Sequence, residues 1–457
     1  MKVIIVNSPL FRDRNELYDE DSLPPLGLGY IATHLQNNNV EVRIIDAVFE
    51  RMPLNEIISI INRERPDFVA VNIFTTNYNL VRELICSISI NTHIIVGGLS
   101  TKHLYYQICE WESENQIDVI TGDGELITLD IVRNTVKDKP FFETDNRRAF
   151  KIDAFSNYIV NDISEVPLDR KFFKNEPVNH PLGFVEANIV TSRGCVYNCT
   201  FCAAARSLNK EYPIREKSEI SIKNELKDFR ESYPRVNSIR VLDDLFLKNK
   251  NSVQKAVSVF NPFSFQWRSM AHVMTFKDVD DRLMQDLKTS GCFELFIGIE
   301  SGSPKILNNI KKTKDISAII KNLSKVFRAG INVKGYFIYG FPEEEQEDMD
   351  ATFRLAEELK KISLFYKTNF RTSVFQYRPY HGSQIYHELE NQGKDLKVKA
   401  VLPNSSLSDL VGRFQFNFHS GNYSQVAYEI VQSYIYRTIN LNNGELYGGL
   451  KSKVEAL

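Results

Sequence analysis

Three cysteines lie within eight residues of the chain, in the segment Thr191-Ser-Arg-Gly-Cys-Val-Tyr-Asn-Cys-Thr-Phe-Cys202. The spacing Cys195-x-x-x-Cys199-x-x-Cys202 lets one loop place three thiolates around a single inorganic cluster. A cubane of four irons with three protein ligands keeps one iron open, and an open position separates a catalytic metal site from a structural one. The loop therefore predicts a metal centre with room for one further ligand.

Two other metal sites fit the loop less well. Zinc sites usually pair two Cys-x-x-Cys units, or a cysteine pair with a histidine pair, and neither follows Cys202. The bacterial ferredoxin run has a fourth cysteine and a proline, whereas this loop has a wider first gap and lacks both. A chance grouping of structural cysteines stays open as an alternative, although the presence of half of the six cysteines in one loop argues against it.

The cysteine loop resembles the signature of radical S-adenosylmethionine (SAM) enzymes, including the aromatic Phe201 before the last cysteine. The resemblance implies a 4Fe-4S cluster held by Cys195, Cys199 and Cys202, with the amino and carboxylate groups of SAM on the fourth iron. One electron, supplied by an external donor such as flavodoxin or ferredoxin, would cleave SAM into methionine and a 5′-deoxyadenosyl radical. That radical abstracts hydrogen from an unactivated carbon of a small-molecule or peptide substrate.

Segments after the expected strands also resemble this family. Val241-Leu-Asp-Asp-Leu-Phe246 is similar to an acidic pair that holds the amino group of SAM, since carboxylates accept hydrogen bonds from an amine. Gly298-Ile-Glu-Ser-Gly-Ser303 resembles a Gly-x-Glu-Ser-Gly motif, and the segment 335–343 resembles an Ile-x-Gly-x-x-Glu element beside the adenine. A polar loop that caps a helix is the structural alternative for each aspartate. The implied SAM-binding residues are Asp243, Asp244, Glu300, Ser301, Gly340 and Glu343.

The candidates for direct catalysis are few. Cys292 precedes an expected strand at its entry, so we expect a packing role, with hydrogen-atom donation to a substrate radical as the alternative. The eight histidines show no metal-ligand spacing. Alternation along a strand would turn some of the tyrosines near the core away from a substrate. The remaining candidates are His381 and His387 as general acid or base, and Tyr336, Tyr339 and Tyr377.

These residues must be positioned by a barrel. Strand and helix patterns alternate from about Phe184 to Ser383, and reactive groups of such barrels lie at the carboxyl ends of the strands. With its cysteine loop after the first strand, the region resembles the partial (β/α)6 barrel of radical SAM enzymes, which we place at residues 184–390. The loop Pro379-Tyr-His-Gly-Ser383 resembles the one that closes this core. Strands are expected at 185–190, 238–242, 293–299, 333–339 and 372–377, and helices at 218–229, 279–289, 316–329 and 345–359.

The first 140 residues predict a parallel, doubly wound sheet of the Rossmann-like type. Short β-rich runs alternate with helical patterns, and loops at the carboxyl ends of such strands form a ligand crevice. A helix is expected at 24–36, where prolines start the helix and three asparagines end it. Strands are expected at 3–6, 42–45, 68–73, 94–96 and 119–120.

Residues 1–140 resemble the cobalamin-binding domain that precedes many radical SAM cores. The matching segments are Pro25-Leu-Gly-Leu-Gly-Tyr30 with Ile45-Asp46, then Val96-Gly-Gly98 and Gly122-Asp-Gly-Glu125. No Asp-x-His-x-x-Gly follows the first strand, so no histidine is evident as a lower ligand to cobalt. The alternative to cobalamin binding is that the glycines of these segments only shape the turns between strands and helices. The implied cobalamin contacts are Ser8, Thr75, Gly97, Gly98, Gly122 and Glu125.

Length and composition fit this division. A chain of 457 residues exceeds the size at which one core keeps growing, and 43% hydrophobic with 25% charged residues is typical of a globular protein. We expect 141–183 to connect the domains and supply one strand, and 391–457 to form a helical cap over the barrel mouth. The net charge of −2 gives no general attraction to nucleic acid, and no run approaches the ~20 apolar residues of a membrane span. We expect a cytoplasmic protein.

The sequence favours a radical SAM enzyme that uses cobalamin, most often to methylate an unactivated carbon in a natural product or peptide. The first alternative is a cobalamin-independent radical SAM epimerase, dehydratase or rearrangement enzyme. The second belongs to another class, an iron-sulfur redox sensor or nucleic-acid-binding protein without radical catalysis. The acidic pair and Glu300 argue against the second alternative, because a sensor has no need to hold an amino acid.

Overall fold

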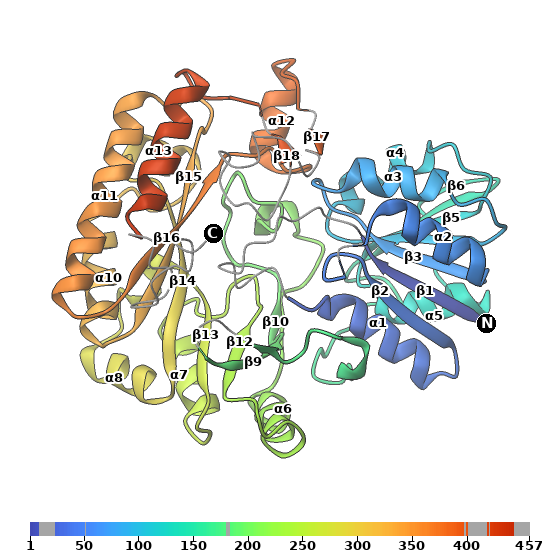
Figure 1. Cartoon of the computed structure of the whole chain (residues 1–457), viewed down its shortest axis with the longest axis horizontal. Helices are drawn as coiled ribbons and strands as arrows, with labels where there is room; N and C mark the ends of the chain where they lie inside the picture. The colour runs from blue at the N-terminus through green and yellow to red at the C-terminus, as the bar shows by residue number, and fades with distance from the viewer. Residues whose placement is uncertain are drawn as a thin grey trace, which may run out of the picture.

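The computed structural model of the chain describes residues 1–8, 23–50, 52–179, 183–396, 399–400, 418–419 and 421–442. Two seven-stranded sheets, both largely parallel, form two domains that lie side by side (Figure 1). The predicted fold class is confirmed, with a doubly wound domain followed by a partial barrel. In the described part of the chain, no helix combines the length and apolarity needed to cross a membrane.

The first domain has the strand order β2-β1-β3-β4-β5-β7-β6. Two apolar cores cover the two faces of this sheet. Helices α1 (Leu26–Asn37) and α5 (Glu125–Arg133) pack on one face, and α2 (Leu54–Glu64), α3 (Tyr78–Cys86) and α4 (Thr101–Cys109) on the other. The parallel strands are β1 (Lys2–Asn7), β2 (Glu41–Asp46), β3 (Phe68–Asn72), β4 (His93–Gly97), β5 (Ile117–Gly122) and β7 (Arg147–Ile152), and β6 (Phe142–Thr144) is antiparallel to β7.

The region between the domains contributes more strands than the single one expected. The hairpin of β6 and β7 extends the first sheet, while β8 (Val178–Asn179) pairs with the first strand of the second sheet. Short 3-10 helices occur at Arg170–Phe172, Arg206–Leu208 and Val273–Phe276.

The second domain is a curled sheet in the order β16-β15-β14-β13-β12-β9-β8, in which the strands from β9 to β16 are parallel. Its helices cover the outer face (Figure 1). The strands are β9 (Val185–Ile189), β12 (Ser238–Val241), β13 (Gln266–Ala271), β14 (Cys292–Glu300), β15 (Asn332–Tyr339) and β16 (Phe370–Gln376). The helices are α6 (Glu219–Ser232), α7 (Lys250–Phe260), α8 (Asp281–Thr289), α9 (Pro304–Asn309), α10 (Ile316–Arg328), α11 (Gln346–Phe365) and α12 (Gln384–Asn391).

Charged side chains fill the interior of the barrel. Arg268 of β13 is fully buried and donates to Glu186 Oε1 and Oε2 at 2.5 and 2.7 Å. Arg371 of β16 donates to Glu294 of β14 at 2.6 and 2.7 Å. Strand β13, Gln-Trp-Arg-Ser-Met-Ala, was not among the strands placed from the sequence, because it has no β-branched residue and no apolar run.

Helix α13 (Tyr428–Asn440) packs against β16 and α11, on the outer side of the barrel (Figure 1). This differs from the expected position over the barrel mouth, and most of the segment 391–457 lies outside the described residues. Beyond the helix, Asn442 borders the edge strand: Thr372 N donates to Asn442 Oδ1 at 2.8 Å, and Asn442 Nδ2 donates to Thr372 O at 3.1 Å. The only strands described in this segment are the short antiparallel pair β17 (Lys399–Ala400) and β18 (Phe418–His419).

Candidate functional site

The cysteine loop follows β9 at the carboxyl edge of the second sheet. Its first residues are held by Asp243, which comes directly after β12. The Asp243 carboxylate accepts hydrogen bonds from Thr191 N and Thr191 Oγ1, both at 2.6 Å, and from Ser192 Oγ at 2.7 Å. Further along the loop, Thr200 N donates to Ile310 O at 3.3 Å. The loop is therefore fixed at both ends by the barrel.

The thiols of Cys195, Cys199 and Cys202 are partly buried and form no disulfide. Burial raises the pKa of all three, that of Cys202 to about 12, so the loop without metal carries neutral thiols and must release protons when it binds iron. Within the described residues, no three metal-ligating side chains converge on a single point. Three cysteines on one loop fit the set of three thiolate ligands that a 4Fe-4S cluster with one open iron would need.

The two members of the acidic pair have different tasks. Asp243 is fully buried against Thr191 and Ser192 and anchors the loop. Asp244 accepts a hydrogen bond from Gly194 N at 3.2 Å and lines a cavity of about 290 Å³ together with Cys195. Burial raises the pKa of both carboxyls. Asp244 is thus the member of the pair that faces the cavity beside the cysteines.

A buried cation that the sequence analysis did not single out lies beside Glu300. Lys312 Nζ donates to Glu300 Oε1 and to Gly298 O, both at 2.8 Å. A Cβ at Gly298 would lie 2.3 Å from Glu300 Oε1 and 2.8 Å from Lys312 Nζ, so only glycine leaves room for this pair. Burial opposes the charged form, but Glu300 and Cys199 hold the pKa of Lys312 above its usual value. Lys312 thus brings positive charge to the cysteine loop.

An aromatic contact also joins the loop to the barrel. The ring of Tyr197 stacks on His272, which follows β13, with centroids 3.9 Å apart. Burial, with a further contribution from Lys312, lowers the pKa of His272 to about 3, so its imidazole is neutral. Neither residue was predicted, because a lone histidine and a lone tyrosine carry no spacing signal.

Three other residues predicted as SAM contacts follow the neighbouring strands: Ser301 comes after β14, and Gly340 and Glu343 come after β15. Ser301 Oγ is 2.9 Å from Thr352 Oγ1 of α11 and is fully buried. Glu343 is exposed in a left-handed conformation with φ 62°, whereas the next residue, Glu344, is buried and accepts hydrogen bonds from Gly340 N and Phe341 N at 2.6 and 3.0 Å. Burial raises the pKa of Glu344 to about 8. Glu344 therefore braces this turn, and its neighbour Glu343 remains a prediction as a SAM contact.

Most of the catalytic candidates take part in packing or in contacts with the first domain. Tyr339 is buried on the outer face of the sheet, where its hydroxyl is 2.8 Å from Thr438 Oγ1 of α13. Cys292 is fully buried at the amino end of β14, opposite the mouth. His381 contacts the first domain, with Nδ1 at 2.9 Å from Thr75 Oγ1. Tyr377 is buried against Phe341 and Tyr423. His387 lies near His103 of the first domain. Tyr336 lies beside Phe296 and Lys334 on the inner face of the sheet.

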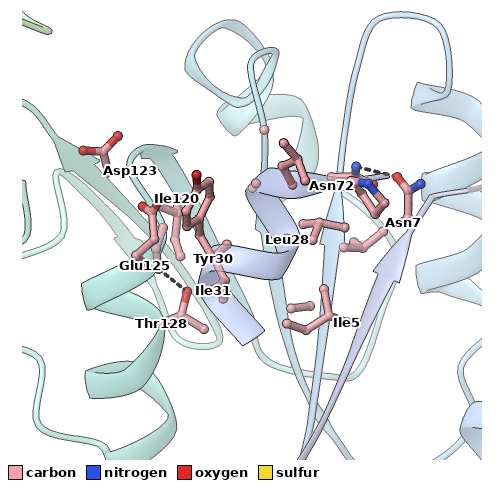
Figure 2. A pocket seen from close by; sticks show the side chains of 18 of the residues that line it. Ile5, Asn7, Leu28, Tyr30, Ile31, Asn72, Ile120, Asp123, Glu125 and Thr128 are labelled. Carbon is pink, nitrogen blue, oxygen red and sulfur yellow. Dashed lines mark hydrogen bonds between the residues drawn. The ribbon is translucent and has the colours of Figure 1, made fainter. Parts of the chain in front are cut away.

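A second cavity, of about 470 Å³, opens at the carboxyl edge of the first sheet. It lies beside the switch point of the sheet, where β2 and β3 flank β1, which is the usual ligand position in such folds. Figure 2 shows Asp123, Glu125 and Tyr30 on one side of the cavity and Asn7 and Asn72 on the other. The floor is apolar and the rim is polar, which fits a large ligand with a flat apolar ring and polar edges.

Four of the six predicted cobalamin contacts line this cavity, namely Gly97, Gly98, Gly122 and Glu125. Ser8 and Thr75 are not among the residues that line it in the described part of the chain. The amide of Ser8 donates to Asn72 Oδ1 at 2.7 Å, and Thr75 binds His381. No histidine lines this cavity among the described residues.

Comparisons with known proteins match both domains. The model of the radical SAM superfamily matches residues 189–356, and that of the B12 binding domain matches residues 20–132. The uncharacterized methyltransferase PH0819 of Pyrococcus horikoshii is 28% identical, over 79% of this chain and 78% of that protein. The cytidylyl-2-hydroxyethylphosphonate methyltransferase of Streptomyces wedmorensis is 22% identical, over 86% of this chain and 82% of that protein.

Among solved structures, the cobalamin-dependent SAM radical enzyme OxsB with aqua-cobalamin and SAM bound is similar, with a TM-score of 0.63. The likeness covers 93% of this chain and 64% of OxsB, so the chain spans slightly less than two thirds of that protein. At 16% identity it shows a common fold. The two family matches therefore identify the chain as a member of the radical SAM superfamily, over residues 189–356, with an amino-terminal domain of the B12-binding family, over residues 20–132.

Proposed function

We propose that this enzyme is a cobalamin-dependent radical SAM methyltransferase that acts on an unactivated carbon of a natural product or peptide. Cys195, Cys199 and Cys202 would hold a 4Fe-4S cluster, and the cavity of the first domain would hold cobalamin. Methyltransferase relatives that span most of the chain support this proposal. The observation that carries it is that the two cavities share a wall made of Gly98, Gly122, Asp123 and Arg193.

A shared wall matters because the reaction needs two reagents at one carbon. A bound 4Fe-4S cluster would supply the electron that cleaves SAM, and bound cobalamin would supply the methyl group. The residues of this chain bind, orient and shield these groups. Asp244 would accept hydrogen bonds from the SAM amino group, while Glu300 and Lys312 would stand beside the same cofactor at the end of β14. Asp243 keeps the cysteine loop in place.

The test uses the anaerobically reconstituted full chain, with hydroxocobalamin, SAM and a chemical reductant. The proposal expects one corrin per chain by absorbance, and both 5′-deoxyadenosine and S-adenosylhomocysteine as products of SAM. Cys195→Ala should abolish 5′-deoxyadenosine, whereas Cys86→Ala, an exposed cysteine outside the loop, should not. Bound corrin without S-adenosylhomocysteine would contradict methyl transfer.

Two other outcomes would favour the alternatives. A chain that forms 5′-deoxyadenosine but binds no corrin would be a cobalamin-independent radical SAM epimerase, dehydratase or rearrangement enzyme. A chain that binds iron but never cleaves SAM would instead be a redox sensor or nucleic-acid-binding protein.

A further inference from the structure

The segment Gly122-Asp-Gly-Glu125, at the end of β5, is the place where the first domain contacts the cysteine loop. Arg193, two residues before Cys195, donates from NH2 to Glu125 Oε1 at 2.5 Å and from NH1 to Asp123 Oδ1 at 3.1 Å. Its guanidinium also lies 5.7 Å from the ring centre of Tyr30 on α1. Arg193 of the barrel domain thus binds two carboxylates of the first domain and lies beside one of its aromatic rings.

A second arginine binds the same carboxylate. Arg215 NH1 pairs with Asp123 Oδ2, and Arg215 NH2 donates to Asp123 Oδ1 at 3.1 Å. The two arginines are neighbours in the antiparallel pair of β10 (Ser192–Arg193) and β11 (Arg215–Glu216), which brackets the cysteine loop. Side chains of Asp123 and Arg215 are each 10% exposed, and that of Glu125 is 5% exposed, so the pairs are largely shielded from water.

The backbone of the segment is also shaped for this contact. Gly122 has φ 109°, and a Cβ there would lie 2.4 Å from Ile152 O and 2.9 Å from the ring of Tyr212. Tyr212 belongs to the barrel domain, and its hydroxyl is 3.3 Å from Thr121 Oγ1. The first glycine of the segment therefore leaves space for an aromatic ring of the other domain, in addition to its place in the wall of the cavity.

The charges of this contact balance, because two arginines face two carboxylates. Loss of one arginine would leave a carboxylate without its partner in the closed contact, where it is largely shielded from water, and this costs more than the loss of an exposed ion pair. Opening of the domains would return that carboxylate to water, so the variant favours the open arrangement. Bidentate and charge-assisted bonds of this kind also fix orientation as well as distance.

We propose that Arg193, Arg215, Asp123 and Glu125 form an interdomain clamp that sets the distance between the cavity of the first domain and the cysteine loop. Arg193 is its central positioning residue, because it lines both cavities. This inference rests on the proposed function, in which one cofactor occupies each side of the clamp. Two reagents that must reach one carbon tolerate only small errors in position, and a misplacement of about 1 Å can cost about 100-fold in rate.

The test measures the distance between the two cofactors in the full, reconstituted chain. Pulsed electron paramagnetic resonance detects the coupling of cob(II)alamin to the reduced cluster. Wild type should give one narrow distance, and Arg193→Met should give a broad or longer distribution, with Arg193→Lys between them. The matched control is Arg148→Met, which breaks a bidentate pair with Asp118 inside the first domain, at 2.8 and 2.6 Å, and should leave the distance unchanged.

A second measurement covers the case in which Arg193→Met loses a cofactor. Small-angle X-ray scattering on Glu125→Gln and Arg193→Met without cofactors should show a larger radius of gyration than for wild type and Arg148→Met. If Arg193→Met keeps both cofactors, a distance between them as narrow as in wild type would overturn the clamp. If it loses a cofactor, a radius of gyration equal to that of wild type would overturn the clamp. Failure of the proposed function would give a different result, because the wild-type chain would then bind no corrin. The radius of gyration of the variants would still show whether the clamp holds the two domains together.

Discussion

Replacement of Lys312 by methionine should destabilise the barrel by an amount that the structure allows us to estimate. The change removes the ammonium that binds Glu300 Oε1 and Gly298 O, but it keeps most of the apolar stem. The Glu300 carboxylate, whose side chain is only 9% exposed, then stays buried without its cation.

Breaking one side of a buried ion pair costs about 3–5 kcal/mol, and we expect the lower figure because Glu300 keeps some contact with water. For a domain of this size, 1 kcal/mol corresponds to about 2–4 °C in melting temperature. Lys312→Met should therefore lower the melting temperature of the barrel by about 6–12 °C. Adding Glu300→Gln removes the stranded charge, so the double variant should recover part of this loss.

Thermal unfolding of the iron-free protein under reducing, anaerobic conditions at pH 7 measures these shifts without any contribution from metal. Lys311→Met is the matched control, since this neighbouring lysine is exposed and its ammonium donates to Gln384 Oε1, a neutral partner. It should stay within about 0.5 kcal/mol of wild type. Equal melting temperatures for Lys312→Met and Lys311→Met would refute the buried pair. It would also be refuted if the destabilisation of the double variant equalled the sum of the effects of Lys312→Met and Glu300→Gln.

Three further predictions concern the loop, the interface and the turn after β5. Asp243→Asn should weaken the anchoring of the loop by about 1–3 kcal/mol and lower the iron bound per chain, measured by metal analysis after reconstitution. Burial lowers the pKa of His103 and His381 to about 4, so the unfolded state binds more protons between about pH 4 and 6.5, and stability should fall as the pH drops through that window. The double variant His103→Gln/His381→Gln should show a weaker dependence of melting temperature on pH. Gly122→Ala should cost about 1–3 kcal/mol because of its positive φ, whereas Gly124→Ala, whose Cβ would meet only the flexible end of Ile31 at 3.0 Å, should melt close to wild type.

The parts of the site that depend on local spacing could be predicted from the sequence. The cysteine loop is contiguous, and the acidic pair and Glu300 follow strands with clear apolar patterns. Lys312 was missed because it lies in the run Lys311-Lys-Thr-Lys314, which is typical of a solvated turn. Its burial arises only when the turn after α9 folds back onto the end of β14, a long-range event with no local signal.

Other differences have equally specific causes. The segment 340–345 contains three consecutive glutamates, and only the backbone turn at Glu343 decides that Glu344 is the one that folds inward. The apolar pattern of α13 predicts a helix but not the element against which it packs. The pairing of Glu125 with Arg193 and of Asp123 with Arg215 could not be predicted, because the partners lie 68 and 92 residues apart in the chain.

The contact of Asn442 with β16 has a consequence for how this chain behaves in a crowded cell. An edge strand with free peptide groups is a template on which another chain can add a strand. The carboxamide of Asn442 bonds both the N–H and the C=O of Thr372, the two groups of this residue that an added strand would need. One side chain thus blocks strand addition at this residue of the edge, and its loss would leave both groups open to another chain.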